Sequence, residues 1–296
     1  MRPELIQASE LLQRNTPESV EQAVALLQNT VYSFSMKICG HREDAEDTMQ
    51  DVLFRSLKYL SKIQDPNALA AWLYTVTRNR CRRMRRGPQN SQAKRLSLDE
   101  LMPDEQEMRE LLQRTERGPE LHAIHAEQQH LLHRAVLALP SPLRLVLVLH
   151  DMEELTSEQV AQILGLQVGT VRVRLHRARL AIRKQMARLL EGLPEPPQKP
   201  GKPLGHRPKE CRDLFAGLSE YVDGRVEPRT CEQMRVHIEA CPACIAFLKD
   251  LRATVDRCRS LDVPCDADIV HRMRSLITRE YMRLVGDSKS MDAAAR

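Results

Sequence analysis

The sequence predicts an all-α protein, in which two small helical domains are joined by a flexible linker and a third small helical domain with clustered cysteines follows. Three observations predict it. Only 3% of the 296 residues are aromatic and 11 are glycine, while Leu, Ala, Arg, Glu and Gln, all good helix formers, are abundant. Apolar residues recur at the three- and four-residue spacing of a helix face. Prolines gather in short segments that would separate the domains.

Length and charge limit the class of protein. At 296 residues the chain can hold two or three domains, each with its own modest core. The formal net charge is +5, and since the charges lie in blocks, their positions say more about partners than the sum does. No run approaches the roughly 20 consecutive apolar residues that span a bilayer, and Met1 to Gln13 lack the apolar core of a secretory signal. We therefore expect no membrane segment and a cytoplasmic location.

The first predicted domain covers residues 1–88. Helices are expected within Glu18 to Lys62 and from Ala68 to about Met84, separated by the Asp65-Pro66 break. Gly87-Pro88 is a strong stop for the second of these segments. One helical stripe consists of Val20, Val24, Leu27 and Val31.

Two segments of biased composition divide the rest of the chain. One is polar and acidic, and the other contains six prolines, which favours an extended spacer. We expect residue 285 to begin a disordered tail. The predicted divisions are an acidic linker at 89–119, a helical domain at 120–192, a proline-rich linker at 193–208, a compact cysteine-containing domain at 209–260, and a C-terminal helix with its tail at 261–296.

The second domain carries the pattern of a helix-turn-helix. Thr156 with Gln159 forms a capping box at the start of a short helix, and Gly165 supplies the positive φ of a tight turn before a second helix begins near Val168. The apolar run from Leu143 to Asp151 could be a buried strand on periodicity alone, but helix is preferred before this motif. The inner face of the second helix is predicted to hold Val171, Leu175 and Ala178.

The outer face of that second helix is basic. No acidic residue occurs from Gln159 through Leu190, so the span suits DNA phosphates, and arginine can also bind guanine in the major groove. A charge run alone is more often a solvated face, but the capping box, the turn glycine and the one-sided charge together favour DNA. The candidate DNA contacts here are Arg172, Val173, Arg174, His176, Arg177 and Arg179.

Three phrases of the chain resemble the extracytoplasmic-function sigma family of bacterial RNA polymerase. Leu139 to Met186 resembles the domain that reads the minus-35 promoter element. Arg42 to Leu60 and Ala71 to Arg86 resemble the domain that binds polymerase and opens the minus-10 element. The resemblance covers roughly residues 20–190, in the family's order. It implies that core RNA polymerase and promoter DNA are the partners.

The acidic stretch that begins at Glu43 is the candidate polymerase-binding surface. Clustered carboxylates on one helix could face a basic coiled coil of the core enzyme, although such a patch by itself is more often only a solvated face. The resemblance favours docking. The residues assigned to it are Asp44, Asp47, Gln50, Asp51 and Phe54.

A second basic stretch lies between Asp65 and Asp99, where acidic residues are absent. Such a surface attracts the backbone of single-stranded DNA. The resemblance implies minus-10 contacts by the loop Ser61 to Asn67 and by Trp72, Arg78, Asn79, Arg82 and Arg83. Trp72 taken alone is more often a core residue. Val173 and His176 are weak readers of bases, and Gln167 replaces a capping serine of many relatives, so no promoter sequence can be transferred.

Six of the eight cysteines lie after residue 210. His237, Cys241 and Cys244 follow the spacing H-x3-C-x2-C, which lets three soft ligands converge on one zinc ion. The stretch Glu210 to Leu251 resembles the zinc-binding anti-sigma domain, which implies that Cys211 is the fourth ligand, with Cys231 as the competing candidate. Four protein ligands leave no open position, so the ion would be structural.

The sequence therefore predicts a sigma factor that is not an enzyme and has no small-molecule substrate. The tethered zinc domain would contact the sigma domains within the molecule and regulate them in cis, because a short linker keeps its local concentration high. Two alternatives remain. One is a helix-turn-helix regulator that acts on duplex DNA without polymerase, and the other is a hydrolase that uses the Cys/His cluster and a metal.

Overall fold

The computed structural model describes residues 1–14, 16–60, 63, 65–84, 125–190 and 217–294, and every regular element in these ranges is helical. The all-α prediction is confirmed. Both predicted linkers, at 89–119 and 193–208, lie outside the described residues. The chain divides into two compact units: unit 1 contains residues 1–92, 153–166 and 262–296, and unit 2 contains residues 93–152 and 167–261.

Unit 1 is built around the helices of the first predicted domain. Its elements are α1 (Pro3–Arg14), α2 (Pro17–Cys39), α3 (Arg42–Leu60), α4 (Pro66–Met84), α9 (Ser157–Leu164) and α14 (Ala267–Ala294). Helix α2 starts at a capping box in which Thr16 and Ser19 satisfy each other's backbone N–H, and it ends at Gly40, whose φ of 77° suits glycine.

The core of unit 1 includes the predicted stripe on α2. Val20, Val24, Leu27 and Val31 are all buried. Phe34 of α2 meets Tyr74 of α4 edge to face, with ring centroids 4.8 Å apart, which is a favourable aromatic geometry. The domain expected from the sequence therefore has a real core.

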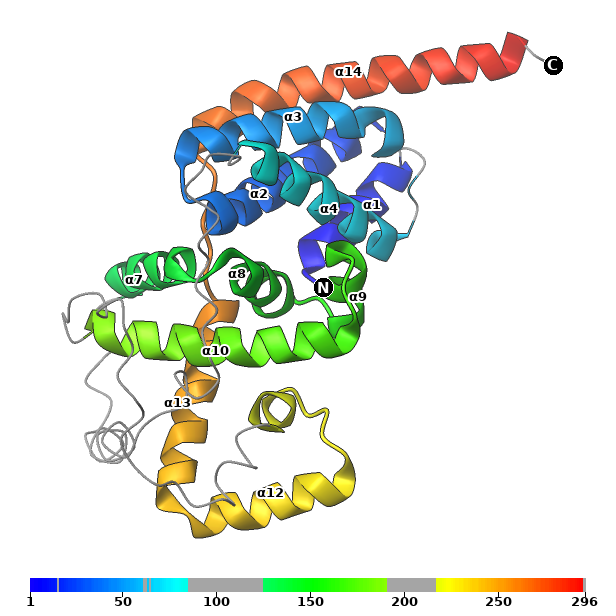
Figure 1. The fold of residues 1–296 in the computed structure, drawn as a ribbon. Coiled ribbons are helices and arrows are strands. Elements are labelled where there is room, and N and C mark those ends of the chain that lie inside the picture. The colour runs from blue at the N-terminus through cyan, green and yellow to red at the C-terminus, as the bar shows by residue number, and fades with distance from the viewer. Residues whose placement is uncertain (15, 61–62, 64, 85–124, 191–216, 295–296) are drawn as a thin grey trace. The chain divides into compact units, whose positions relative to one another are not determined.

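One further helix of this core comes from the C-terminal part of the chain. Helix α14 lies along α2 and α3 (Figure 1) and buries a stripe at four-residue spacing. The stripe consists of Ile269, Met273, Ile277 and Tyr281. The helix runs to Ala294, whereas the sequence analysis expects disorder beyond Val285. The buried stripe anchors the first half of the helix, and from there helix formation can propagate into the polar end.

Unit 2 contains the rest of the second domain and the cysteine-containing domain. Its elements are α7 (His125–Ala138), α8 (Ser141–Leu147), the π-helical turn η2 (Val148–Met152), α10 (Val168–Leu190), a short helix at 217–222, α12 (Pro228–Ala240) and α13 (Pro242–Arg259). The helical interpretation of the apolar run before residue 152 is confirmed. The inner face of α10 is buried as predicted, through Val171, Leu175 and Ala178.

Helix α13 packs against α10 within unit 2. Phe247, Leu251 and Val255 of α13 are buried, and the guanidinium of Arg183 on α10 lies 4.7 Å from the centroid of the Phe247 ring. A stacked arginine of this kind is held by cation–π attraction as well as by packing. The compact unit therefore joins α10 to the cysteine-containing domain.

No helix among the described residues combines the length and the apolarity needed to cross a membrane.

Candidate functional site

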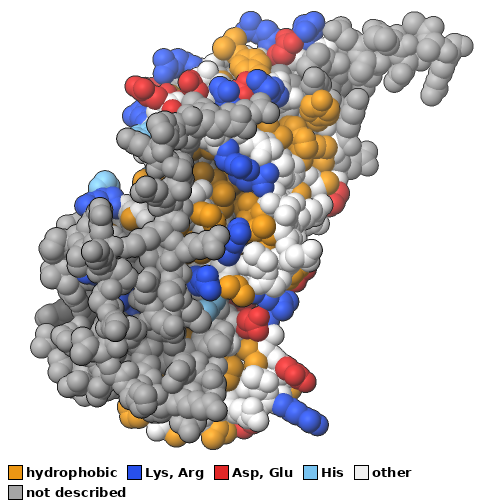
Figure 2. Space-filling model, viewed as in Figure 1, with side chains coloured by type: hydrophobic (Ala, Val, Ile, Leu, Met, Phe, Trp, Pro, Cys, Tyr) orange, Lys and Arg blue, Asp and Glu red, His pale blue; other side chains and the backbone are white. Residues whose placement is uncertain are grey.

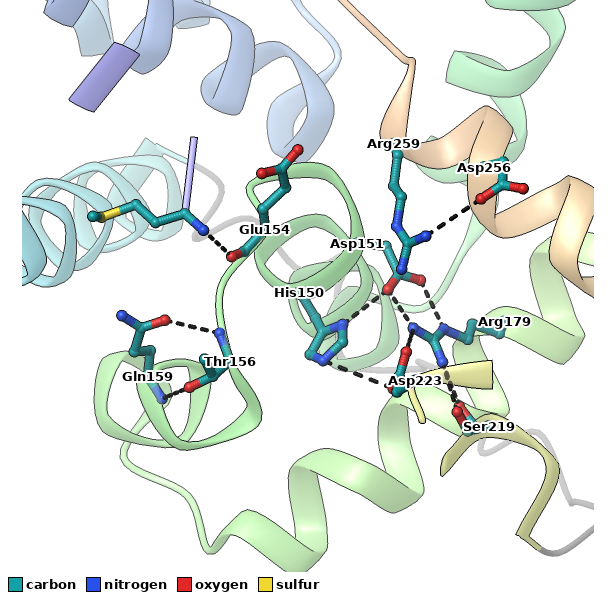
Figure 3. A network of polar contacts seen from close by, with 11 residues as sticks. His150, Asp151, Glu154, Thr156, Gln159, Arg179, Ser219, Asp223, Asp256 and Arg259 are labelled. Carbon is teal, nitrogen blue, oxygen red and sulfur yellow. Dashed lines mark hydrogen bonds and ion pairs between the residues drawn. The ribbon is translucent and has the colours of Figure 1, made fainter. Parts of the chain in front are cut away.

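The helix-turn-helix signature has the local geometry that the sequence predicts. Thr156 and Gln159 cap each other's backbone at the start of α9 (Figure 3), and Gly165 ends that helix with a φ of 65°. A side chain at φ near +65° is strained, so glycine suits this turn. Helix α10 begins three residues later, at Val168.

The six residues of α10 assigned to DNA differ strongly in exposure. Val173 is 53% exposed and Arg172 is also exposed, while Arg174 and Arg177 are half-buried. His176 and Arg179, in contrast, are buried. Of the six assigned residues, Arg172 and Val173 are therefore the ones that are exposed in this arrangement.

Arg179 is the centre of a buried polar network in unit 2 (Figure 3). Its Nε and Nη2 donate to the two carboxylate oxygens of Asp151, at 2.8 and 2.6 Å. Nη2 also donates to Asp223 Oδ1 at 2.7 Å, and Nη1 donates to Ser219 Oγ at 2.9 Å and to its backbone oxygen at 3.1 Å. A guanidinium with all its donors engaged in this way is not available to DNA.

The network is electrostatically consistent. Burial alone would raise the pKa of Asp151, but the charge of Arg179 and hydrogen bonds from Arg179 and His150 outweigh it and hold that pKa well below its usual range. Burial would lower the pKa of Arg179, and the carboxylates of Asp151 and Asp223 instead raise it. The buried cation is fully ionised and needs both carboxylates.

Asp223 and Ser219 come from the cysteine-containing domain, and so does Asp250, whose Oδ2 lies 3.2 Å from Arg183 Nη1. None of these three residues is among the candidates that the sequence patterns predict. The one sequence signal for such partners is the absence of acidic residues in α10. A helix of this composition cannot neutralise a buried arginine with its own side chains, so the carboxylates must come from elsewhere in the chain.

The predicted metal ligands His237, Cys241 and Cys244 come together. Their candidate ligand atoms all lie within 4.8 Å of one another, and Cys244 Sγ is 3.5 Å from His237 Nε2. Helix α12 ends at Ala240 and α13 begins at Pro242, so the histidine precedes and the second cysteine follows a tight helix junction. This donor set suits zinc. Cys211 lies outside the described residues, and Cys231 is not part of the cluster.

On α3, the residues assigned to polymerase are accessible within unit 1. Phe54 is 46% exposed, Asp47 and Gln50 are exposed, and Asp44 and Asp51 are half-buried. In the space-filling view, acidic and basic side chains lie next to one another in the region that Figure 1 labels α3 and α14 (Figure 2). Asp51 itself is paired with Arg55 and Arg80, at 2.8 and 3.3 Å.

On α4, the residues assigned to the minus-10 element lie toward one surface of unit 1. Asn79 and Arg82 are exposed, and Trp72 is half-buried with its ring 5.8 Å from that of Tyr59. Arg78 is half-buried, and Arg83 lies outside the described side chains. The Trp72 ring therefore packs against Tyr59 within unit 1.

Comparison with known proteins matches three parts of the chain to families. Residues 23–90 match sigma-70 region 2, residues 129–182 match sigma-70 region 4, and residues 211–244 match a zinc-finger family. The zinc-finger match ends at Cys244 and starts at Cys211.

Several relatives align with more than half of the chain. RNA polymerase sigma factor YlaC of Bacillus subtilis is 26% identical over 174 residues, which is 59% of this chain and 95% of YlaC. The ECF RNA polymerase sigma factor SigW of the same organism is 25% identical, covering 59% of this chain and 92% of SigW. The ECF RNA polymerase sigma factor SigE of Mycolicibacterium smegmatis is 28% identical, covering 57% of this chain and 62% of SigE.

His176 makes the stability of unit 2 depend on pH. Burial lowers its pKa to about 4, and the charges of Arg179 and Arg177 add to the shift. Because the unfolded chain takes up the proton below about pH 6.5 while the folded one does not, stability is lost as the pH falls from there toward 4. The loss is on the order of 3 kcal/mol.

We expect His176→Gln to flatten this dependence in urea unfolding followed at pH 7, 5.5 and 4.5. The control is His130→Gln, at an exposed histidine of α7, which should keep the wild-type slope. Equal slopes in all three proteins would show that His176 is not buried in its neutral form. The stability that Asp151 contributes is lost only at lower pH, below about 3.9, where the unfolded chain takes up a proton at this carboxylate.

Proposed function

We propose that the chain is a sigma factor of the extracytoplasmic-function family, which directs RNA polymerase to a set of promoters, and that its fused zinc domain regulates it in cis. The matches to sigma-70 region 2 and sigma-70 region 4 support the first part. RNA synthesis would belong to the core enzyme, and this chain would supply recognition without a chemical step of its own. A cytoplasmic location is part of the same proposal, because core RNA polymerase and promoter DNA would be found there.

The polymerase contact is assigned to the exposed face of α3. Asp47, Gln50 and Phe54 combine charge with an exposed aromatic ring, which is the composition of a protein interface. Helix α14 packs on this same helix, yet it leaves these three side chains exposed. Docking of the polymerase at α3 therefore needs no removal of α14.

We expect Asp47→Lys to weaken association with core polymerase about tenfold, because it places a cation where a basic partner docks. Association is measured by titration with fluorescently labelled full-length protein, together with transcription in vitro. The control is Glu10→Lys, which makes the same charge change at an exposed site on α1. If both variants bind as the wild type does, the docking surface lies elsewhere; if the wild type does not bind core polymerase, the sigma function is refuted.

We assign the minus-35 contact to the start of α10 and the minus-10 contact to α4. On α10, Arg172 and Val173 are exposed and Arg174 and Arg177 partly so, which gives a basic surface for phosphates with one apolar contact. On α4, Asn79 and Arg82 are exposed near the helix end. Two basic helices in two units could bind separate elements of one promoter.

The metal is proposed to be zinc, bound by His237, Cys241, Cys244 and Cys211. The first three converge, and the family match spans Cys211 to Cys244. The exclusion of Cys231 from the cluster favours Cys211 as the fourth ligand. Four protein ligands would make the ion structural, and they would hold α12 against α13.

We expect one zinc per full-length chain by elemental analysis of the purified protein. Cys241→Ala and Cys211→Ala should lower retention of zinc in the presence of a chelator, because each removes a thiolate. Cys231→Ala is the control and should retain the metal. Loss of zinc from Cys231→Ala with retention by Cys211→Ala would exchange the two assignments.

Regulation in cis is supported by contacts inside unit 2. Asp223 and Ser219 bind Arg179, while Asp250 and Phe247 contact Arg183, so the cysteine-containing domain holds two basic residues of α10. While these contacts are made, the donors of Arg179 are satisfied by Asp223 and Ser219 and are not available to DNA. Truncation is a poor test, because deleting the C-terminal residues also removes α14 from unit 1.

We expect Asp223→Asn to raise the affinity of the full-length protein for a mixed-sequence duplex 30-mer about threefold or more, because α10 is released in a larger fraction of molecules. Fluorescence anisotropy measures it. Asp256→Asn is the control: it removes the same charge from an exposed pair with Arg259. Equal affinity in the two variants would contradict regulation through Asp223.

A further inference from the structure

A second buried carboxylate, Glu153, organises unit 1. Its Oε1 accepts from Lys37 Nζ at 3.0 Å, its Oε2 accepts from the hydroxyl of Tyr74 at 2.8 Å, and Arg2 Nε lies 3.2 Å from the same oxygen. The side chains of Lys37 and Glu153 are both almost completely buried. Glu153 lies in the stretch matched to sigma-70 region 4, whereas Lys37 and Tyr74 lie in the stretch matched to region 2.

The backbone next to Glu153 has an unusual conformation. Glu154 has a φ of 56°, a left-handed conformation that is uncommon for a residue other than glycine. The N-terminal ammonium of Met1 donates to the backbone oxygen of Glu154 (Figure 3), beside the contact that Arg2 makes with Glu153. Met1 and Arg2, which precede the region 2 match, therefore both contact this turn.

Helix α9 then lies against α4 within the same unit. Arg78 Nη1 donates to the backbone oxygen of Ile163 at the end of α9, at 2.5 Å. Gln159 Nε2 donates to Asn67 Oδ1 at 2.9 Å. Arg78 and Asn67 are among the residues assigned above to the minus-10 element. Donors and acceptors engaged with α9 are not available to DNA.

We propose that the segment 153–166, which carries the first helix of the helix-turn-helix, is an internal cover on the minus-10 surface of α4, latched by Glu153. This inference rests on the proposed function, since it assumes that α4 contacts promoter DNA. It is separate from the hold on α10, because its residues lie in unit 1 and none of its contacts involves the cysteine-containing domain.

The chemistry of the latch suits a reversible cover. Burial lowers the pKa of Lys37, and the Glu153 charge opposes that shift, so the pair is stabilised mainly by mutual attraction. On opening, both ions regain water, which offsets much of the attraction that is lost. If only open molecules bind DNA, the apparent affinity is the affinity of the open state multiplied by the fraction of molecules that are open. A partner that binds only the open state would shift the balance.

The test uses full-length protein and a fluorescent single-stranded 20-mer of mixed DNA sequence. Gln159→Glu keeps the side-chain oxygen that caps Thr156 but replaces the donor to Asn67 with an acceptor, so α9 should loosen without loss of its cap. Gln162→Glu, at an exposed site of the same helix, adds the same charge and is the matched control. Glu153→Gln removes the latch charge directly.

We expect Gln159→Glu and Glu153→Gln to bind the oligonucleotide about threefold to tenfold more tightly than Gln162→Glu. Hydrogen exchange in 153–166 should be faster in the first two. Faster exchange with unchanged or weaker DNA binding would overturn the cover, because a purely structural contact loosens without such a gain. If Glu153→Gln folds poorly, the comparison of Gln159→Glu with Gln162→Glu still tests the proposed cover. Core polymerase association of the same samples tests the sigma function separately.

Discussion

The buried guanidinium of Arg179 is the constraint on which unit 2 depends. An arginine that is fully removed from water must have its donors satisfied and its charge matched, or the fold is destabilised by several kcal/mol. Asp151 of η2 supplies one carboxylate, and Asp223 and Ser219 of the cysteine-containing domain supply the rest. The helix that is expected to read DNA therefore shares its charge balance with the domain that is expected to control it.

Two neighbouring acidic residues have parallel roles in the two units. Asp151 neutralises Arg179 in unit 2, and Glu153, two positions later, neutralises Lys37 in unit 1. The π-helical turn that contains Asp151 and the left-handed residue after Glu153 are both departures from regular helix. Such departures cluster where a side chain must be aimed at a particular partner. Each carboxylate therefore neutralises a buried cation of its own unit, Arg179 on α10 for Asp151 and Lys37 on α2 for Glu153.

Local patterns in the sequence predicted much of the fold. Apolar spacing located the stripe on α2 and the inner face of α10, and the cap at Thr156 and the turn at Gly165 appear as predicted. The convergence of His237, Cys241 and Cys244 was predictable because the three residues span only seven positions, so local geometry brings them together. The fourth ligand depends on a distant cysteine and stays a prediction.

Long-range pairing was not predictable from the sequence. A basic run indicates an exposed helix, yet the partners that bury Arg179 and Arg183 lie 28 to 67 positions away in the sequence. The stripe from Ile269 to Tyr281 is visible in the sequence, but nothing local says that it packs on α2 and α3. For the same reason the contact between Arg78 and Ile163 could not be anticipated, since periodicity reports faces and not their partners.

A double-mutant cycle between Arg179 and Asp223 tests the central claim most directly. The free energy of unfolding of full-length protein is measured for the wild type, Arg179→Met, Asp223→Asn and the double variant. The account predicts a coupling of about 1–3 kcal/mol, because the two side chains share a buried contact. Effects that add to within about 0.5 kcal/mol would contradict it, since independent sites behave in that way.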